Sequence, residues 1–237
     1  MPRATQSSQT RILDRIAAEA RACTACDLPL GPRPVFRVST TARLLIVGQA
    51  PGVRVHNTGI PWNDPSGERL RSWLAVDRAA FYDGARVAII PIGLCYPGTA
   101  PNGGDYPPRR ACAPLWHPRL RGALSNIELT LLVGSYAQAH YLGERRGAST
   151  TQTVRAFRDH LPAFLPIPHP SWRTTGWQKR NPWFDSDVLP ELRRRVHALS
   201  ATPDCHSREA CPREGGERGS TLETSSGSTC GFPPARE

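Results

Sequence analysis

Four short apolar runs alternate along the chain with segments in which apolar residues recur at helical spacing. The runs cover residues 42–48, 86–92, 127–134 and 163–170. Helical spacing fits residues 68–76, 109–124, 135–143, 151–161 and 185–200, although Pro190 should bend or delay the last helix. Apolar strands that alternate with helices are typical of a parallel sheet covered on both faces. The pattern therefore predicts an α/β protein, a three-layer αβα fold around a central, mainly parallel four-stranded sheet.

Composition divides the chain into three parts. Residues 1–22 hold an N-terminal helix, capped by Ser7 or Ser8, that leads into a cysteine-containing loop. Residues 23–200 form the folded domain. Residues 201–237 are rich in Gly, Ser, Pro and charge, so we expect a disordered tail. No apolar run approaches 18 residues and no signal-peptide pattern opens the chain, so we expect a cytoplasmic protein with no membrane partner and with reduced cysteines.

The charge balance bears on the partner. The formal net charge is +10, and residues 201–237 carry four Arg against six acidic residues, so residues 1–200 carry +12. A basic domain favours a polyanionic partner, nucleic acid first and an anionic membrane surface second. However, 29 of the 30 basic residues are Arg, a bias that a GC-rich genome can also produce. Charge alone therefore does not decide the function.

Unusual residues gather where the predicted strands end. In parallel α/β folds the ligand site forms at the carboxyl ends of the strands. The loop after the first strand, "GQAPGVRVHNTGIPWNDPSG", carries Gln49, Trp62 and Asp64, and the fourth strand ends in "PHPSWR" with His169 between two prolines. Asp64 could simply cap a helix and Trp62 could simply pack in the core. Together with His169 they predict two walls of one pocket suited to a base taken out of its stack.

Four cysteines form a separate pattern. Cys23 and Cys26 are two residues apart after the first helix, Cys95 follows the second strand, and Cys112 opens a helix. Two close thiols with two distant ones suit zinc or an iron–sulfur cluster in a reducing compartment. The alternative is that these are four unrelated small core residues. Cys205, Cys211 and Cys230 lie in the predicted tail and receive no role.

Three of these motifs resemble those of a known family. "GQAPG", "GIPWNDPSG" and "HPSWR" are similar to motifs of the uracil-DNA glycosylase superfamily, and the cysteine spacing resembles its iron–sulfur branches. The similarity covers roughly residues 23–198. It implies a monofunctional DNA glycosylase of base excision repair, which hydrolyses the N-glycosidic bond of uracil or a related damaged base. It also implies a monomer that binds single- or double-stranded DNA, with a structural 4Fe–4S cluster on Cys23, Cys26, Cys95 and Cys112; zinc is the alternative.

The resemblance implies a role for each matched residue. Asp64 corresponds to a carboxylate that positions water or stabilises an oxocarbenium-like sugar, and His169 to a histidine that hydrogen-bonds uracil O2. Such a fixed donor would stabilise the negative charge on the departing base. The substrate-binding candidates are Gln49 and Ala50, whose backbone would line the pocket, Trp62, which would stack on the base, Arg173, which would fill the gap left by the flipped nucleotide, and their motif neighbours Asn63 and Ser171.

One position departs from the family pattern. In the iron–sulfur branch an asparagine four residues before the third cysteine reads the Watson–Crick edge of uracil, and here that position is Pro91. Proline has neither a side-chain donor nor a backbone N–H, so it cannot make that contact. The nearby Asn102 cannot be assigned to the pocket from the sequence. The departure puts the excised base in question more than the fold.

Two alternative functions remain open from the sequence. The first is a non-catalytic protein of the same fold that binds DNA or lesions, which Pro91 favours and the retained Asp64 and His169 oppose. The second is an enzyme acting on free nucleotides, with "GQAPG" around a phosphate. That loop lacks the Lys and the Ser or Thr of a P-loop, and a free nucleotide does not need so basic a surface. The loop of residues 98–108, followed by Arg109 and Arg110, could either grip DNA phosphates or be a solvated turn.

Overall fold

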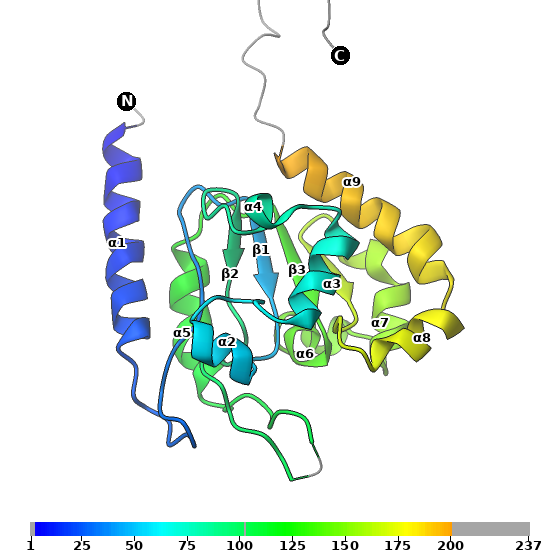
Figure 1. Ribbon diagram of the computed structural model, residues 1–237. Coiled ribbons are helices and arrows are strands. Elements are labelled where there is room, and N and C mark those ends of the chain that lie inside the picture. Colours follow the sequence, from blue (N-terminus) through cyan, green and yellow to red (C-terminus); the bar gives the residue numbers. More distant parts are fainter. Residues whose placement is uncertain (1–2, 102, 201–237) are drawn as a thin grey trace, which may run out of the picture. The chain divides into compact units, whose positions relative to one another are not determined.

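A four-stranded, all-parallel sheet forms the centre of the molecule (Figure 1). The computed structural model describes residues 3–101 and 103–200, so the predicted tail of residues 201–237 and Asn102 lie outside the described residues. The strands are β1 (Leu44–Val47), β2 (Val87–Ile89), β3 (Leu129–Val133) and β4 (Phe164–Ile167), in the spatial order β2-β1-β3-β4. Each strand lies inside one of the four apolar runs, and the expected α/β fold class is confirmed.

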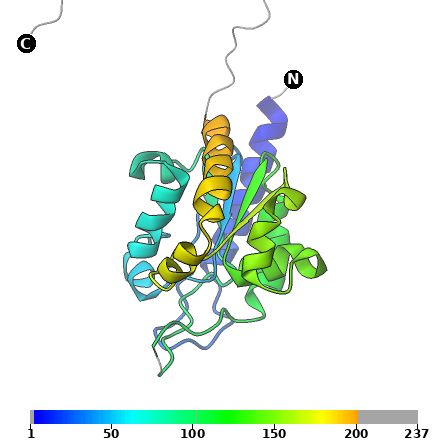
Figure 2. The same cartoon turned by 90° about the vertical axis from the view of Figure 1, so that its right-hand side faces the viewer.

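Helices cover both faces of the sheet, as Figure 2 shows in a side view. Alternate residues of β1 point to opposite faces, so Leu44 and Ile46 join one core and Leu45 and Val47 the other. The first core includes residues of α3 (Pro65–Leu74), α7 (Thr150–Arg155) and α9 (Leu189–Ser200). The second includes residues of α1 (Arg3–Arg21), α5 (Cys112–Gly122) and α6 (Ser135–Leu142). The arrangement is the three-layer αβα fold.

Several shorter helical elements complete the described chain. Pro190 is the second residue of α9, and a π-helical turn of residues 184–188 leads directly into this helix, so the chain is helical over residues 184–200. The helix expected over residues 151–161 is divided into α7 and a 3-10 turn, and α8 was not predicted. The remaining elements are α2 (Val53–Thr58), α4 (Arg78–Phe81), η1 (Gly143–Arg145), η2 (Phe157–His160), α8 (Thr174–Arg180) and η3 (Phe184–Val188).

The parallel register brings the loops after the strands to one edge of the sheet. Ile46 of β1 pairs with Ile89 of β2 and with Leu131 of β3, and Val133 of β3 pairs with Ile167 of β4. All four strands therefore end at the same level, at the lower edge of the sheet in Figure 1. Among the described residues, no helix has the length and apolar character needed to cross a membrane.

Candidate active site

A cavity of about 620 Å³ opens at the carboxyl ends of the strands. Its walls come from the segments that follow β1, β2 and β4, and from the loop of residues 98–108. This is the position at which parallel α/β folds bind ligands. The cavity brings together seven of the residues singled out in the sequence: Gln49, Ala50, Trp62, Asp64, His169, Ser171 and Arg173.

Trp62 is held in an unusual backbone conformation. Its φ angle is +56°, a left-handed value that is rare for an aromatic residue and is characteristic of functional sites. A Cβ atom on Gly67 would lie 1.8 Å from the Trp62 carbonyl oxygen, and one on Gly48 would lie 2.7 Å from its indole ring. The two glycines therefore make room for Trp62. Arg71 donates a hydrogen bond of 3.3 Å to the same carbonyl, which fixes the backbone further.

Asp64 has two functions in the structure. It is the N-cap of α3, and its Oδ1 accepts a hydrogen bond of 2.7 Å from the backbone N–H of Gly67. It also lines the cavity. Because the cap occupies one carboxylate oxygen, the hydrogen bonds found among the described residues leave Oδ2 available to a ligand. The capping role and the site role expected from the sequence are thus compatible.

His169 lies next to Trp62 in the wall of the cavity. The centres of the two rings are 5.6 Å apart, with 33° between their planes. Burial lowers the pKa of His169, while the nearby Asp64 carboxylate acts in the opposite direction. The imidazole is therefore neutral at neutral pH and can donate one hydrogen bond. A Cβ atom on Gly134, at the end of β3, would lie 3.3 Å from the His169 Cβ, so this glycine allows the close approach.

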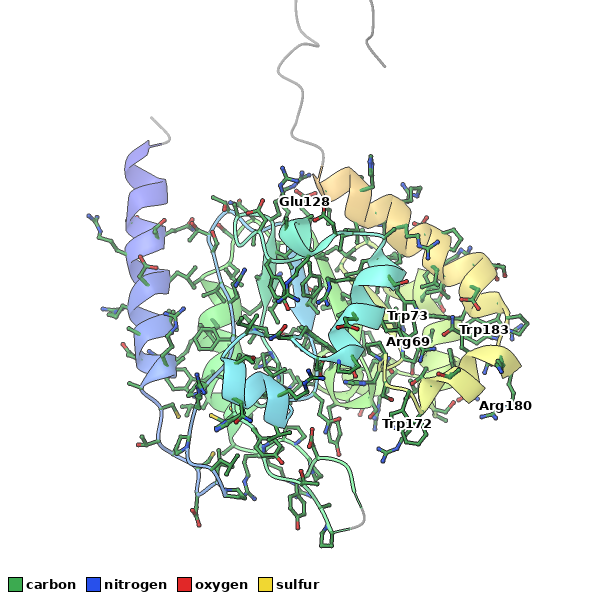
Figure 3. The ribbon with its side chains drawn as sticks, in the orientation of Figure 1. Arg69, Trp73, Glu128, Trp172, Arg180 and Trp183 are labelled. Atoms are coloured by element: carbon green, nitrogen blue, oxygen red, sulfur yellow. The ribbon has the colours of Figure 1, made fainter. Side chains whose placement is uncertain are left out.

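Arg69 of α3 anchors the loop that carries His169. Its guanidinium donates hydrogen bonds to the Ser171 carbonyl (2.9 Å), to Thr175 Oγ1 (2.9 Å) and to Gln178 Oε1 (2.7 Å). Figure 3 shows Arg69 beside Trp73, and its guanidinium carbon lies 5.2 Å from that ring centre. The anchor is a long-range one, and nothing in the spacing of the sequence indicates it.

Arg173 lines the cavity, and Trp172 lies beside Arg173 at the surface. Trp172 is 78% exposed, and Figure 3 shows its side chain projecting from the body of the protein. The Arg173 guanidinium carbon is 5.3 Å from the Trp172 ring centre, and its Nη1 lies 3.3 Å from where a Cβ on Gly104 would be. Arg173 therefore reaches across to the loop of residues 98–108.

Pro91 lines the cavity but offers it no free polar group. His117 of α5 is buried, and its Nε2 lies 3.0 Å from the Pro91 carbonyl oxygen while its Nδ1 lies 2.9 Å from the Tyr141 hydroxyl. Because a carbonyl only accepts, Nε2 carries the hydrogen and the hydroxyl donates to Nδ1. Burial lowers the pKa of His117 to about 4, so the imidazole is neutral. The Pro91 carbonyl is thus already engaged within the protein.

The loop of residues 98–108 forms a wall of the cavity, a role that the sequence did not indicate. It is closed by hydrogen bonds from Ala100 N to Gly104 O and from Tyr106 N to Gly98 O, each 2.8 Å long. Asp105 lines the cavity, and its Oδ2 lies 3.3 Å from where a Cβ on Gly52 would be. Desolvation first, and the Asp64 charge second, raise the pKa of Asp105.

Asn63 lies apart from the other predicted site residues. Its side-chain oxygen accepts a hydrogen bond of 3.0 Å from Arg78, and it does not line the cavity. Besides Asp105, sequence reasoning missed His117, Tyr141 and Arg69. Each of these three acts through a contact between residues at least 24 positions apart, which no local motif reveals.

The four cysteines line a second, small cavity, whose walls also include Gly93 and Leu94 after β2. Burial raises the pKa of the Cys95 thiol to about 11 and also raises that of Cys112. The backbone N–H of Leu94 lies 3.3 Å from the Cys112 sulfur, and the backbone of Arg33 hydrogen-bonds Cys95. Within residues 3–101 and 103–200, no three His, Cys, Asp or Glu side chains form a group that could hold a metal ion.

The donor chemistry around this cavity nevertheless fits a sulfur-ligated group. Trp116 lies one helical turn after Cys112 and lines the same cavity. Its indole N–H is buried and lacks a hydrogen-bond partner among the described residues. A buried donor without an acceptor is costly, and a thiolate or sulfide in the cavity would satisfy it.

A comparison with models of protein families identifies the family of this chain. The model of the uracil DNA glycosylase superfamily matches residues 36–193, two thirds of the chain, and the match includes every residue named at the strand-end cavity. The chain therefore belongs to the uracil DNA glycosylase superfamily.

Proposed function

We propose that this protein is a monofunctional DNA glycosylase that hydrolyses the N-glycosidic bond of uracil or a related damaged base. The observation that carries the proposal is the meeting of Trp62, Asp64 and His169 in one strand-end cavity, in a chain of this superfamily. All three side chains come from one chain, so a monomer suffices. The cavity volume of about 620 Å³ is within the range of small-molecule sites and accommodates a single base.

The arrangement suits the charge that develops during the reaction. Cleavage leaves negative charge on the departing base and positive charge on the sugar. A neutral His169 can donate a hydrogen bond to a base carbonyl, as in an oxyanion hole. Asp64, fixed as a helix cap with one oxygen still available, can stabilise the sugar cation or orient a water molecule. Trp62 packs against Gly48 and lies beside His169, so its ring can stack on the base while His169 contacts the edge of the base.

The surroundings of the cavity support DNA as the partner. The chain carries a formal net charge of +10, which attracts the phosphate backbone. Trp172, 78% exposed beside Arg173, presents an aromatic face at the cavity mouth. Exposed aromatic rings next to basic residues bind unstacked bases. We infer that this pair contacts the DNA next to the flipped nucleotide.

We also propose that Cys23, Cys26, Cys95 and Cys112 hold a 4Fe–4S cluster, with zinc as the alternative. Bound there, the group would join the segment after α1 to the segment after β2 and to the start of α5 and would have a structural function. The Leu94 N–H at the Cys112 sulfur and the unpaired Trp116 N–H support a sulfur-rich occupant. Iron and sulfide analysis of the purified protein, with its visible absorbance, distinguishes the cluster from zinc.

The function is tested with labelled oligonucleotides carrying one uracil, either single-stranded or opposite guanine. After incubation, hot alkali cuts the strand at each abasic site. We expect cleavage by the wild type and loss of about 100-fold or more in rate for Asp64→Asn and His169→Ala, since each removes a group that stabilises developing charge. Cleavage that both variants retain would contradict the assignment of the cavity.

A second candidate is a non-catalytic protein that binds DNA or lesions. The observation that favours it is Pro91, whose carbonyl is engaged by His117 and which therefore cannot read the base. If the protein with its sulfur-ligated group intact binds uracil-containing DNA tightly but releases no uracil, hypoxanthine or other damaged base, this candidate replaces the glycosylase.

A further inference from the structure

The cavity needs a group that reads the hydrogen-bonding edge of the base, and position 91 cannot supply it. The Pro91 side chain has no donor, its nitrogen has no hydrogen, and its carbonyl already accepts from His117 Nε2 at 3.0 Å. The group that hydrogen-bonds to the edge of the base must therefore come from another wall of the cavity. This inference rests on the proposed glycosylase function and deepens it by naming the residue that selects the base.

Asp105 comes from a loop that lies beside the Pro91 segment. The loop packs against the segment that follows Pro91, because a Cβ atom on Gly93 would lie 2.8 Å from the Pro108 Cβ. Asp64 and His169 are already engaged in the proposed chemistry. The other polar side chains that line the cavity are Gln49, Ser66, Asp105, Tyr106, Ser171 and Arg173. Of these, only an amide or a protonated carboxyl group presents a donor and an acceptor side by side, which leaves Gln49 and Asp105.

Asp105 is exposed, and hydrogen bonds within its loop fix its backbone. Asp105 forms a β-bridge with Thr99, and the two hydrogen bonds of 2.8 Å on either side close the loop. Its Oδ2 abuts Gly52, where a Cβ atom would lie only 3.3 Å away. The last glycine of "GQAPG" thus leaves space for this carboxyl group. We infer that Asp105, in its protonated form, pairs with the ring N–H and the adjacent carbonyl of the base.

A protonated carboxyl group presents the same pattern as a primary amide. Its O–H donates while its C=O accepts, side by side, so it can pair with N3–H and O4 of uracil or with N1–H and O6 of hypoxanthine. An ionised carboxylate could accept from the ring N–H but would repel the carbonyl oxygen and the negative charge that develops on the departing base. The substrate class is therefore a base with a ring N–H next to a carbonyl.

The surroundings of Asp105 act on its pKa. Partial desolvation of the carboxyl group first, and the like charge of Asp64 second, raise this pKa. Gly52 brings no charge, and His169 is neutral because burial lowers its pKa. Arg173, above Gly104, is the cation that opposes this effect. A bound base would exclude more water and raise the pKa of Asp105 further.

The test compares Asp105→Asn and Asp105→Ala with the wild type in single-turnover excision of uracil from pH 5 to 9. The wild-type rate should fall as the pH rises through the raised pKa of Asp105. Asp105→Asn should keep a rate within a few-fold of the low-pH wild type and lose this alkaline fall. Asp105→Ala should lose about ten- to a hundredfold at every pH, because a base-edge pair is missing. A fall in rate at low pH that comes from protonation of His169 is shared by all variants.

Two further measurements distinguish a failure of this inference from a failure of the proposed glycosylase function. Asp159→Asn removes an exposed carboxylate outside the cavity and should match the wild type. Binding to DNA with a non-cleavable 2′-fluoro-deoxyuridine, against undamaged DNA, reports base reading without chemistry. If the wild type prefers the uracil analogue but does not cleave uracil-containing DNA, only the glycosylase function is overturned. Loss of that binding preference in Asp105→Ala would then still support the role of Asp105 in reading the base. Cleavage and preference that Asp105→Ala retains, or that Gln49→Ala alone removes, would overturn the inference. A wild type with neither property would overturn both.

Discussion

The segments after β1 and after β2 meet the same cavity in opposite ways. The segment after β1 delivers the side chains of Trp62 and Asp64 to the cavity, held by two glycines and a helix cap. The segment after β2 delivers Pro91, whose carbonyl is turned to His117 inside the protein. The comparison shows that the wall after β1 carries side chains for the proposed chemistry, whereas at the wall after β2, the sealed side, the Pro91 carbonyl is hydrogen-bonded within the protein. On the sealed side, polar contacts come from the neighbouring loop with Asp105.

The largest effect should come from a substitution at Gly67, in the segment after β1 that carries Trp62 and Asp64. In Gly67→Ala the new Cβ would lie 1.8 Å from the Trp62 carbonyl, so the loop must move. We expect a loss of about 3 kcal/mol or more in the free energy of unfolding and loss of excision. Urea unfolding measures the first. Gly122→Ala is the matched control, because nothing lies within 4 Å of its Cβ position, and it should leave stability unchanged or improve it.

Protonation of His117 should destabilise the wall of the cavity that follows β2. Its pKa is about 4 in the folded protein and 6.5 in the unfolded chain, so the unfolded state binds the proton more readily as the pH falls below 6.5. This one group should cost the folded state about 3 kcal/mol between pH 6.5 and 4, with no further loss below. In His117→Gln the amide can still donate to the Pro91 carbonyl. Urea unfolding of this variant should show a free energy of unfolding that lacks the contribution of His117 to the pH dependence.

His56, His140, His160 and His169 also have lowered pKa values, so the wild type and His117→Gln must be compared over the same pH range. An unchanged slope in His117→Gln would show that the imidazole is not buried in its neutral form. The Pro91 wall would then not be sealed as described.

The smallest effect on the fold, with a clear effect on binding, is expected at the open end of the cavity. Trp172 is 78% exposed, so Trp172→Ala should leave the melting temperature within about 1 °C. Loss of one stacked base should weaken binding to uracil-containing DNA about tenfold. Fluorescence anisotropy measures the affinity at fixed salt. Equal affinity would place the DNA path away from this loop.

The sequence predicted the frame of the molecule better than the details of the site. The strands were predictable because each is a short and predominantly apolar run, and the parallel order then places Gln49 and His169 at one edge. The His117–Pro91 contact was not predictable, because it joins residues 26 positions apart through a backbone carbonyl. Asp105 was missed because its position depends on backbone hydrogen bonds within an irregular loop. The positive φ of Trp62 depends on space left by Gly48 and Gly67, which only the folded chain reveals.

The most direct test of the central claim compares two helix-capping aspartates. Asp64 caps α3 through Gly67 and Asp77 caps α4 through Ala80, each at 2.7 Å, but only Asp64 lines the cavity. Asparagine also caps helices, so both substitutions should leave the fold intact. In single-turnover uracil excision, Asp64→Asn should be slower than Asp77→Asn by about 100-fold or more. Equal rates in the two variants would contradict the assignment of this cavity as the active site.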